Sequence, residues 1–183
     1  KVINNKSLII EESILEKEYP FTFKYFNKLK ESLLKRSKKE ILKPFYQYGR
    51  SQGLNKFGIR LLTPTFSQKP NFLTVIEKDS LYCNGYGVHY NIDQNRISLF
   101  DNLPIQNPEN IDVLSKILNS DVMDYYIKTT SVTIDGGYPC YQKNFIELFT
   151  IPNLDISDID KLRSLDDRNF ENEIERIYDL NLE

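Results

Sequence analysis

Apolar residues recur at two different spacings along the chain, and the change of spacing separates helical from extended stretches. After the Tyr19-Pro20 break, apolar side chains follow at intervals of three and four: Phe23, Phe26, Leu29 and Leu33. This interval lines one face of an α-helix, so it predicts a helix over about residues 21–42, which Pro44 ends. Basic residues occupy much of the remaining helical surface.

From Gly58 onward, the apolar residues come in short runs, at 59–63, 72–76 and 81–90, separated by turn-forming clusters such as 67–71. Short runs rich in Ile, Leu, Val, Phe and Tyr predict strands of a mostly antiparallel or mixed sheet. Gly85 and Gly87 in the third run indicate a bulge or a close approach of two backbones. A further run at 96–100 predicts an additional strand.

The second half of the chain contains recognisable helix starts. Asn107-Pro108-Glu109 combines an N-cap Asn, a Pro at the first helical position and an acid in the first turn. Ser120-Asp121 predicts the start of the next helix, whose expected buried residues are Val122, Tyr125 and Tyr126.

Beyond these helices, Gly136-Gly137 predicts a turn, and the run at 145–151 predicts a strand that Pro152 closes. Ser157, with Asp160 three residues later, predicts the start of the last helical region. Apolar residues there keep a helical spacing: Ile159, Leu162, Phe170, Ile174, Ile177 and Tyr178.

These patterns predict an α/β (α+β) fold with a twisted mixed or antiparallel sheet and flanking helices. The 183 residues suffice for one domain with a sizeable core. We predict a single domain over 1–183: a leading helical segment at 1–44, a mixed sheet and helix core at 45–152, and acidic C-terminal helices at 153–183. The chain begins without an initiator Met or a signal peptide, so we interpret it as a fragment of a longer protein.

Charge is distributed unevenly along the chain. The formal net charge is -2, but residues 1–70 carry a net +9, residues 71–143 a net -4 and residues 144–183 a net -7. This asymmetry indicates one face that attracts phosphate and another that faces solvent or a partner. A solvated basic helix explains the positive stretch equally well.

Candidate chemistry is sparse. Cys83, Cys140 and the single His89 do not have metal-ligand spacing, and free thiols predict a reducing, cytoplasmic location. The P-loop and Rossmann glycine fingerprints are missing from the sequence, as is the Pro-Pro-aromatic motif of amino-methyltransferases. No apolar run approaches the roughly 18 residues of a membrane span, so no membrane partner is expected. We predict no catalytic residue, metal site or cofactor site.

Side chains suited to DNA gather in two segments and one turn. Arg reads guanine and Gln reads adenine through paired hydrogen bonds, while Lys and small hydroxyl residues contact phosphates. Each has a structural alternative, since Arg can brace a loop against a carboxylate and Tyr is commonly packed in a core. The candidates are Arg50, Ser51, Gln52 and Lys56, then Lys69, and finally Tyr138, Gln142 and Lys143.

Three segments in one order carry a family resemblance. An aromatic cluster at Phe45-Tyr46-Gln47-Tyr48 runs into Gly49-Arg50-Ser51-Gln52-Gly53; Ile117-Leu118-Asn119-Ser120 leads into Tyr125-Tyr126-Ile127; and Gly136-Gly137-Tyr138 precedes Tyr141-Gln142-Lys143. In that order they resemble the TaqI-like C-terminal specificity domain of bacterial N6-adenine DNA methyltransferases. The resemblance covers roughly residues 19–180.

The resemblance implies a domain similar to the target-recognition domains of type I specificity subunits. It implies that the chain reads double-stranded DNA for a restriction-modification methyltransferase, with or without a fused endonuclease. The parent's N-terminal methyltransferase domain would bind S-adenosylmethionine and flip the target adenine. Two alternatives stay open: a protein-interaction module that docks through the acidic C-terminal helices, and an enzyme of an unrecognised type.

Overall fold

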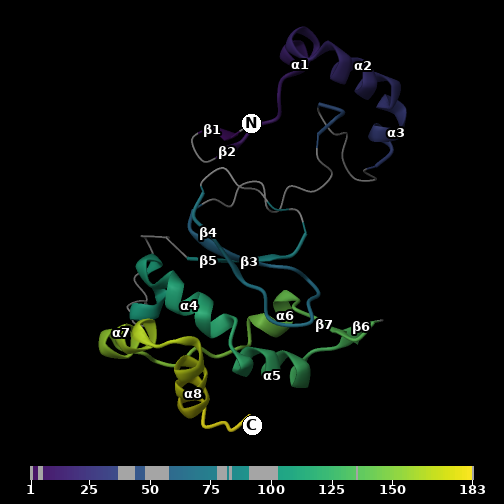
Figure 1. Ribbon diagram of the computed structural model, residues 1–183. Coiled ribbons are helices and arrows are strands. Elements are labelled where there is room, and N and C mark those ends of the chain that lie inside the picture. The colour runs from purple at the N-terminus through teal and green to yellow at the C-terminus, as the bar shows by residue number, and fades with distance from the viewer. Residues whose placement is uncertain are drawn as a thin grey trace. The chain divides into compact units, whose positions relative to one another are not determined.

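The computed structural model describes residues 2–3, 6–36, 44–47, 58–77, 82, 84–90, 103–134 and 136–182. These ranges combine helices with small antiparallel sheets, which confirms the α+β class (Figure 1). Internal contacts divide the chain into unit 1, Lys1–Phe57 with Asp79–Cys83, and unit 2, Gly58–Lys78 with Asn84–Glu183. This division falls near residue 57, whereas the first boundary predicted within a single domain lies at residue 44.

The described part of unit 1 contains two short helices where the sequence predicts one long helix, and a further short helix before them. After the paired strands β1 (Val2–Ile3) and β2 (Lys6–Ser7) come α1 (Glu12–Glu18), α2 (Pro20–Lys28) and α3 (Lys30–Leu34). Pro20 takes the first position of α2, as its fixed φ favours. The predicted continuous helix over 21–42 is wrong because Leu29, with ψ 5°, separates α2 from α3.

The aromatic residues at 45 and 46 hold the helices of unit 1 together. Tyr46 stacks on Phe26 with ring centroids 5.7 Å apart, and its hydroxyl donates to the Ile10 carbonyl at 2.6 Å. Arg36 donates to the carbonyls of Phe45 (3.3 Å) and Gln47 (2.8 Å). Phe45 and Tyr46, the first part of the aromatic cluster, therefore stabilise the packing of unit 1. Residues 48–57, which follow them in the sequence, lie outside the described ranges.

A three-stranded antiparallel sheet forms one layer of unit 2. Its order is β4 (Leu73–Val75), β3 (Arg60–Thr63), β5 (Tyr86–His89), so β3 lies in the centre with Leu61 fully buried. The runs at 59–63, 72–76 and 81–90 are thus confirmed as shorter strands, while 96–100 falls outside the described residues. At Gly85, φ is +90° and a Cβ would lie 2.3 Å from the Thr63 carbonyl oxygen, which confirms the predicted close approach there.

Helix caps set the second layer as the sequence predicts. Two 3-10 turns, η1 (Pro104–Gln106) and η2 (Pro108–Asn110), lead into α4 (Ile111–Leu118), and the Asn107 side chain accepts from the Glu109 amide. Ser120 caps α5 (Asp121–Thr130) by accepting from the Met123 amide. The predicted burial of Tyr125 is wrong: its side chain is 48% exposed, because α5 turns Val122, Met123 and Ile127 inward.

The segment after α5 differs from its predicted structure. Strands β6 (Thr133–Ile134) and β7 (Tyr138–Pro139) form a hairpin across the predicted glycine turn. The predicted strand at 145–151 is wrong, since α6 (Lys143–Ile146) and a turn occupy its start. In this helical turn Phe145, Ile146 and Phe149 pack against the core and are partly buried. The Tyr126 hydroxyl holds the turn in place by donating to the Phe145 carbonyl at 3.0 Å.

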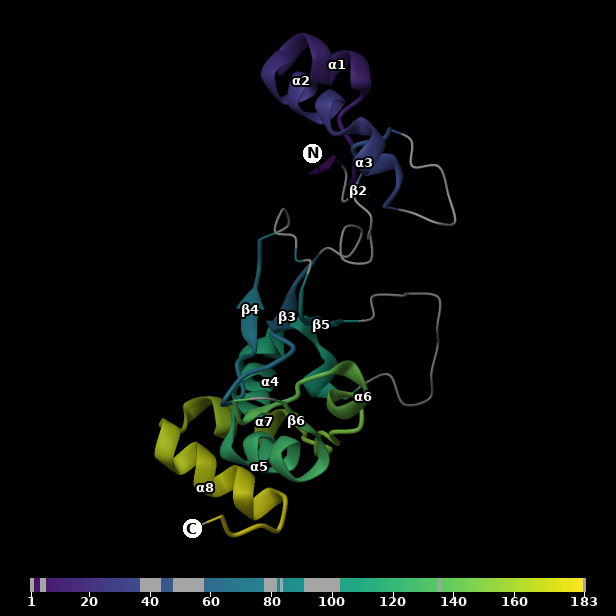
Figure 2. The ribbon, with the colours of Figure 1, turned by 90° about the vertical axis from the view of Figure 1, so that its right-hand side faces the viewer.

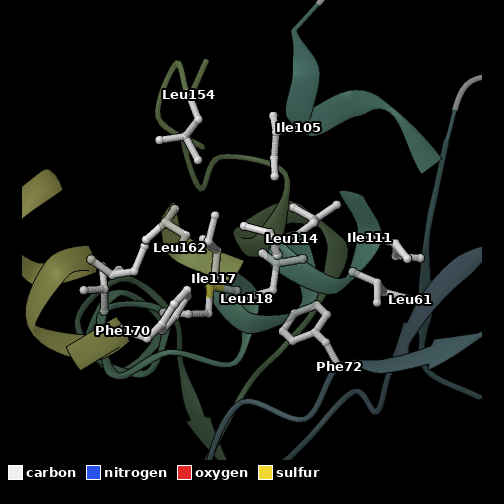
Figure 3. Packing of buried hydrophobic residues seen from close by; sticks show 14 of the residues in the cluster. Leu61, Phe72, Ile105, Ile111, Leu114, Ile117, Leu118, Leu154, Leu162 and Phe170 are labelled. Carbon is white, nitrogen blue, oxygen red and sulfur yellow. The ribbon is translucent and has the colours of Figure 1, made fainter. Parts of the chain in front are cut away.

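Two C-terminal helices complete unit 2: α7 (Ile156–Ser164) and α8 (Asp167–Ile177). The cap of α7 is Asp155 in a capping box with Asp158, so this helix begins two residues before the predicted Ser157 start. Helix α4 contacts β4 and α7, while α8 packs on α5 (Figure 2). Their apolar faces meet in one core, to which the sheet contributes Leu61 and the chain before β4 contributes Phe72 (Figure 3).

Candidate nucleic-acid interface

A single β-bridge joins two segments that are distant in the sequence. Phe66 pairs with Cys140 in an antiparallel bridge, and the Tyr141 amide donates to the Thr65 carbonyl at 2.8 Å. The bridge lays the loop between β3 and β4 beside the chain that follows β7. We call residues 65–69 and 138–143 the candidate surface, because together they carry Lys69, Tyr138, Gln142 and Lys143.

Buried residues anchor the candidate surface from beneath. Cys140 and Tyr141 are 1% and 0% exposed, and the Tyr141 ring meets Phe72 edge-on at 6.3 Å. Burial raises the pKa of the Tyr141 phenol, and the Asp124 carboxylate raises it further, so this hydroxyl stays protonated. The Cys140 amide donates to the Ser131 hydroxyl at 3.3 Å. The neighbouring exposed side chains therefore project from a fixed backbone.

Two glycines position Tyr138 at the hairpin turn. Gly136 and Gly137 have φ of +90° and +79°, which L side chains rarely adopt. A Cβ on Gly136 would lie 3.2 Å from the Tyr138 ring, so the missing side chain lets that ring lie over the turn. Tyr138 keeps 39% of its surface exposed. Its ring therefore offers an accessible aromatic edge on the candidate surface.

Gln142 and Lys143 lie where the buried segment ends and α6 begins. Gln142 takes the N-cap position, yet only its backbone carbonyl serves the helix, accepting from Phe145 at 3.0 Å and Ile146 at 3.1 Å. The side chain of Lys143 is 75% exposed, and its Nζ lies 3.4 Å from a Glu147 carboxylate oxygen. Such an exposed i,i+4 pair contributes little, so a phosphate can replace the carboxylate.

The structure describes four of the eight predicted DNA-contacting residues, and they lie on the two segments that the bridge joins. Lys69 is exposed in the loop that the bridge fixes, beside the segment that carries Tyr138, Gln142 and Lys143. Arg50, Ser51, Gln52 and Lys56 lie outside the described residues. Phe66, 40% exposed, joins the surface and was missed, because the pairing that places it there has no local sequence pattern.

Many acidic side chains of α7 and α8 form hydrogen bonds or ion pairs within unit 2. Glu171 accepts from the Asp121 amide at 3.0 Å and so caps α5, while burial raises the pKa of its carboxyl. Arg163 links α7 to Asp112 at 2.7 Å. Glu173 accepts from Arg176 and, at 3.0 Å, from Lys161, and these two cations lower its pKa to about 2. Charge reversal in α8 would therefore disturb packing as well as the surface field.

The depressed pKa of Glu173 predicts an acid-dependent loss of stability. Because its folded-state pKa is about 2 against an ordinary 4.5, the carboxylate stabilises the fold above pH 4.5. That contribution declines as the pH falls from 4.5 towards 2. In urea titrations at pH 7 and at several pH values between 4.5 and 2, we expect Glu173→Gln to lower stability at pH 7 and to flatten the decline. Glu147→Gln, which alters the exposed pair with Lys143, serves as control; an unchanged slope in Glu173→Gln contradicts the prediction.

Two kinds of feature are missing from the residues that the structure describes. Within them, no group of three or more His, Cys, Asp or Glu side chains can hold a metal ion, and no helix is long and apolar enough to cross a membrane. A surface pocket of about 600 Å³ is lined by Asp121, Asp124 and Glu175 among others. Those carboxylates repel phosphate, which leaves the candidate surface as the better site for DNA.

Comparison of the chain with protein-family models, with curated proteins and with solved structures gives no match. The features of the chain that bear on function are therefore the pairing of the candidate surface and the side chains on it. Lys, Gln and Tyr side chains on these strand and loop segments are of the types that contact phosphates and base edges.

Proposed function

We propose that this chain is the sequence-reading part of a bacterial restriction-modification enzyme of the N6-adenine methyltransferase type. It binds double-stranded DNA and carries no catalytic residues of its own. The Phe66–Cys140 bridge is the observation that carries this proposal, because it pairs the segment that contains Lys69 with the segment that contains Tyr138, Gln142 and Lys143. The ordered resemblance to TaqI-like specificity domains supports the same function.

The side chains on the candidate surface have different roles in recognition. The Gln142 amide offers one donor and one acceptor, which match N7 and N6 of adenine in the major groove. Lys69 and Lys143 are suited to phosphates, which fix the register of the protein on the duplex. The backbone beneath them is held by the buried Tyr141 and Cys140. A site held this way presents its contacts with little loss of conformational freedom on binding.

The remaining functions fall to other parts of the parent enzyme. S-adenosylmethionine binding and methyl transfer belong to its N-terminal methyltransferase domain, the protein partner of this chain. The net charge of -2 limits phosphate binding by this chain alone. Much of the salt-dependent, sequence-independent affinity therefore comes from the methyltransferase domain.

Selection from a randomised duplex pool tests the proposal. We expect the chain to enrich one motif, and Gln142→Ala to flatten the preference at one position by about 1–3 kcal/mol. Lys143→Gln weakens binding to all DNA sequences alike, because it removes a phosphate contact. It also lowers the slope of log affinity against log salt concentration by about 1. Matched controls are Gln106→Ala, an exposed amide elsewhere in unit 2, and Lys128→Gln, which is paired with an i,i+4 acid as Lys143 is.

The same selection separates the proposal from a second candidate function, a protein-interaction module. Ile156, 68% exposed at the start of the acidic helix α7, is the observation that favours this candidate. An interaction module enriches no DNA motif. Enrichment that survives unchanged in both Gln142→Ala and Lys143→Gln would also contradict the proposal, because it would place the reading surface elsewhere.

A further inference from the structure

The exposed face of α2 repeats one pair of side chains. Phe21 precedes Lys24 by three residues, and Tyr25 precedes Lys28 by the same interval. At 3.6 residues per turn, these four side chains share one arc of the helix, with the aromatic residues in one row and the lysines in the next. Phe21 is 89% exposed and Tyr25 60% exposed, and both lysines are exposed.

The packing of unit 1 does not account for this face. Phe23 and Phe26 on the opposite side of α2 are half-buried, and Phe26 stacks on Tyr46 at an interplanar angle of 7°. Tyr25 only leans on Phe26, with ring centroids 6.0 Å apart. Two large rings displayed side by side in water mark an interaction site rather than a scattered surface residue.

Charge identifies the kind of partner. Helix α2 contains two lysines and no acidic residue, and α3 adds Lys30 against one acid, Glu31, whereas the neighbouring α1 carries Glu12, Glu16 and Glu18. The arc of α2 that holds the two rings is therefore the described part of unit 1 that favours an anionic partner. In helices that lie on membranes, the lysines occupy the polar face opposite the apolar one. Here the lysines and the rings share one arc, so each ring has a cation immediately beside it.

We propose that this face of α2 binds single-stranded DNA, with Phe21 and Tyr25 stacking on successive bases while Lys24 and Lys28 contact the adjoining phosphates. The two ring–lysine pairs are four residues apart, which is a rise of about 6 Å along a helix. That spacing exceeds the 3.4 Å of stacked B-DNA, whose base faces are also covered, and fits an extended strand with exposed bases. Every base has a π-face, so binding tolerates any sequence.

This activity goes beyond the proposed function, which concerns duplex reading by the candidate surface of unit 2. Fluorescence anisotropy of a labelled oligothymidylate of about 15 nucleotides, titrated with the full chain, tests it. We expect Phe21→Ala and Tyr25→Ala each to weaken binding by about 5- to 100-fold. The double variant Lys24→Gln, Lys28→Gln lowers the slope of log affinity against log salt by about 1.4.

Tyr125→Ala, which removes a 48% exposed ring from α5, and Lys128→Gln serve as controls and leave oligothymidylate binding unchanged. The variants at Phe21 and Tyr25 keep the parent melting temperature, since neither ring is packed in the core. A second measurement uses Phe21→Trp, which introduces the only tryptophan of the chain. Stacking on a base quenches its fluorescence as oligothymidylate is added.

Several results overturn the proposal: no quenching, a loss of blunt-duplex affinity in Phe21→Ala as large as its loss of oligothymidylate affinity, or tighter binding to oligouridylate. Binding of anionic phospholipid vesicles or self-association that is lost in Phe21→Ala, without oligothymidylate binding, also overturns it by assigning the face to another partner. The two proposals fail separately. Gln142→Ala leaves oligothymidylate binding unchanged, and Phe21→Ala leaves the duplex preference unchanged.

Discussion

Replacing Gly85 with alanine is expected to destabilise unit 2 by about 4 kcal/mol, since two penalties combine. The φ of +90° is a conformation that L side chains rarely adopt. In addition, the new Cβ would lie 2.3 Å from the Thr63 carbonyl oxygen, which is backbone and cannot rotate away. Thr63 pairs with Tyr86 in the central strand, so relief requires β3 and β5 to separate.

Gly58→Ala is the matched control for this prediction. Its φ is +97°, but no atom lies within 4 Å of the position that its Cβ would take. It therefore carries only the conformational cost of about 1–2 kcal/mol. Thermal unfolding followed by circular dichroism should show a melting temperature lower by roughly 8–16 °C for Gly85→Ala and by much less for Gly58→Ala. Equal shifts would mean that the strands separate freely at Thr63.

Local chemistry explains which elements the sequence predicts correctly. The Asn107 and Ser120 caps, the glycine turn at 136–137 and the close approach at Gly85 each depend on a few neighbouring residues with one strong conformational preference. Apolar spacing alone predicts less well. The run at 145–151 is compatible with a buried strand or with a half-buried helical turn. The long-range hydrogen bond from the Tyr126 hydroxyl to the Phe145 carbonyl stabilises the helical turn.

The candidate surface shows the same division between local and non-local information. Gln142 and Lys143 are recognisable as DNA-contacting types from their chemistry. The pairing of their segment with the one that contains Lys69, and the inclusion of Phe66, depend on one bridge between Phe66 and Cys140. No periodicity encodes a single pairing across so long a stretch of chain. The exposed pairs on α2 were missed for a different reason: the apolar face expected from Phe23 and Phe26 accounted for that helix without them.

A side-chain clamp at the end of α4 fixes the chain that carries Lys69. The Asn119 side chain accepts from the Phe72 amide at 2.8 Å and donates to the Phe72 carbonyl at 2.9 Å. Its amide nitrogen also donates to the Ser115 carbonyl at 2.9 Å. Both backbone groups of Phe72 are thus satisfied by one residue, which positions the Phe72 ring in the core, where it is 2% exposed.

Asn119→Asp is expected to cost about 1–2 kcal/mol at pH 7, since it removes the donor and sets a carboxylate against two carbonyl oxygens at a position that water still reaches. Asn153→Asp adds the same charge at an exposed position and should change stability little. Urea unfolding of both variants and the parent measures the difference. If the Asn119 clamp also positions the candidate surface, Asn119→Asp binds duplex DNA more weakly than the parent. Its binding of oligothymidylate through unit 1 is retained.

The pH dependence gives this prediction its sharpest form. The ionised carboxyl repels the two carbonyl oxygens and cannot donate, whereas the protonated carboxyl can donate to the Phe72 carbonyl. The stability deficit against the parent is therefore greatest at neutral pH and shrinks as the pH falls and the carboxyl takes up a proton. A deficit that stays constant between pH 7 and pH 4 would show that the Asn119 donor does not hold Phe72.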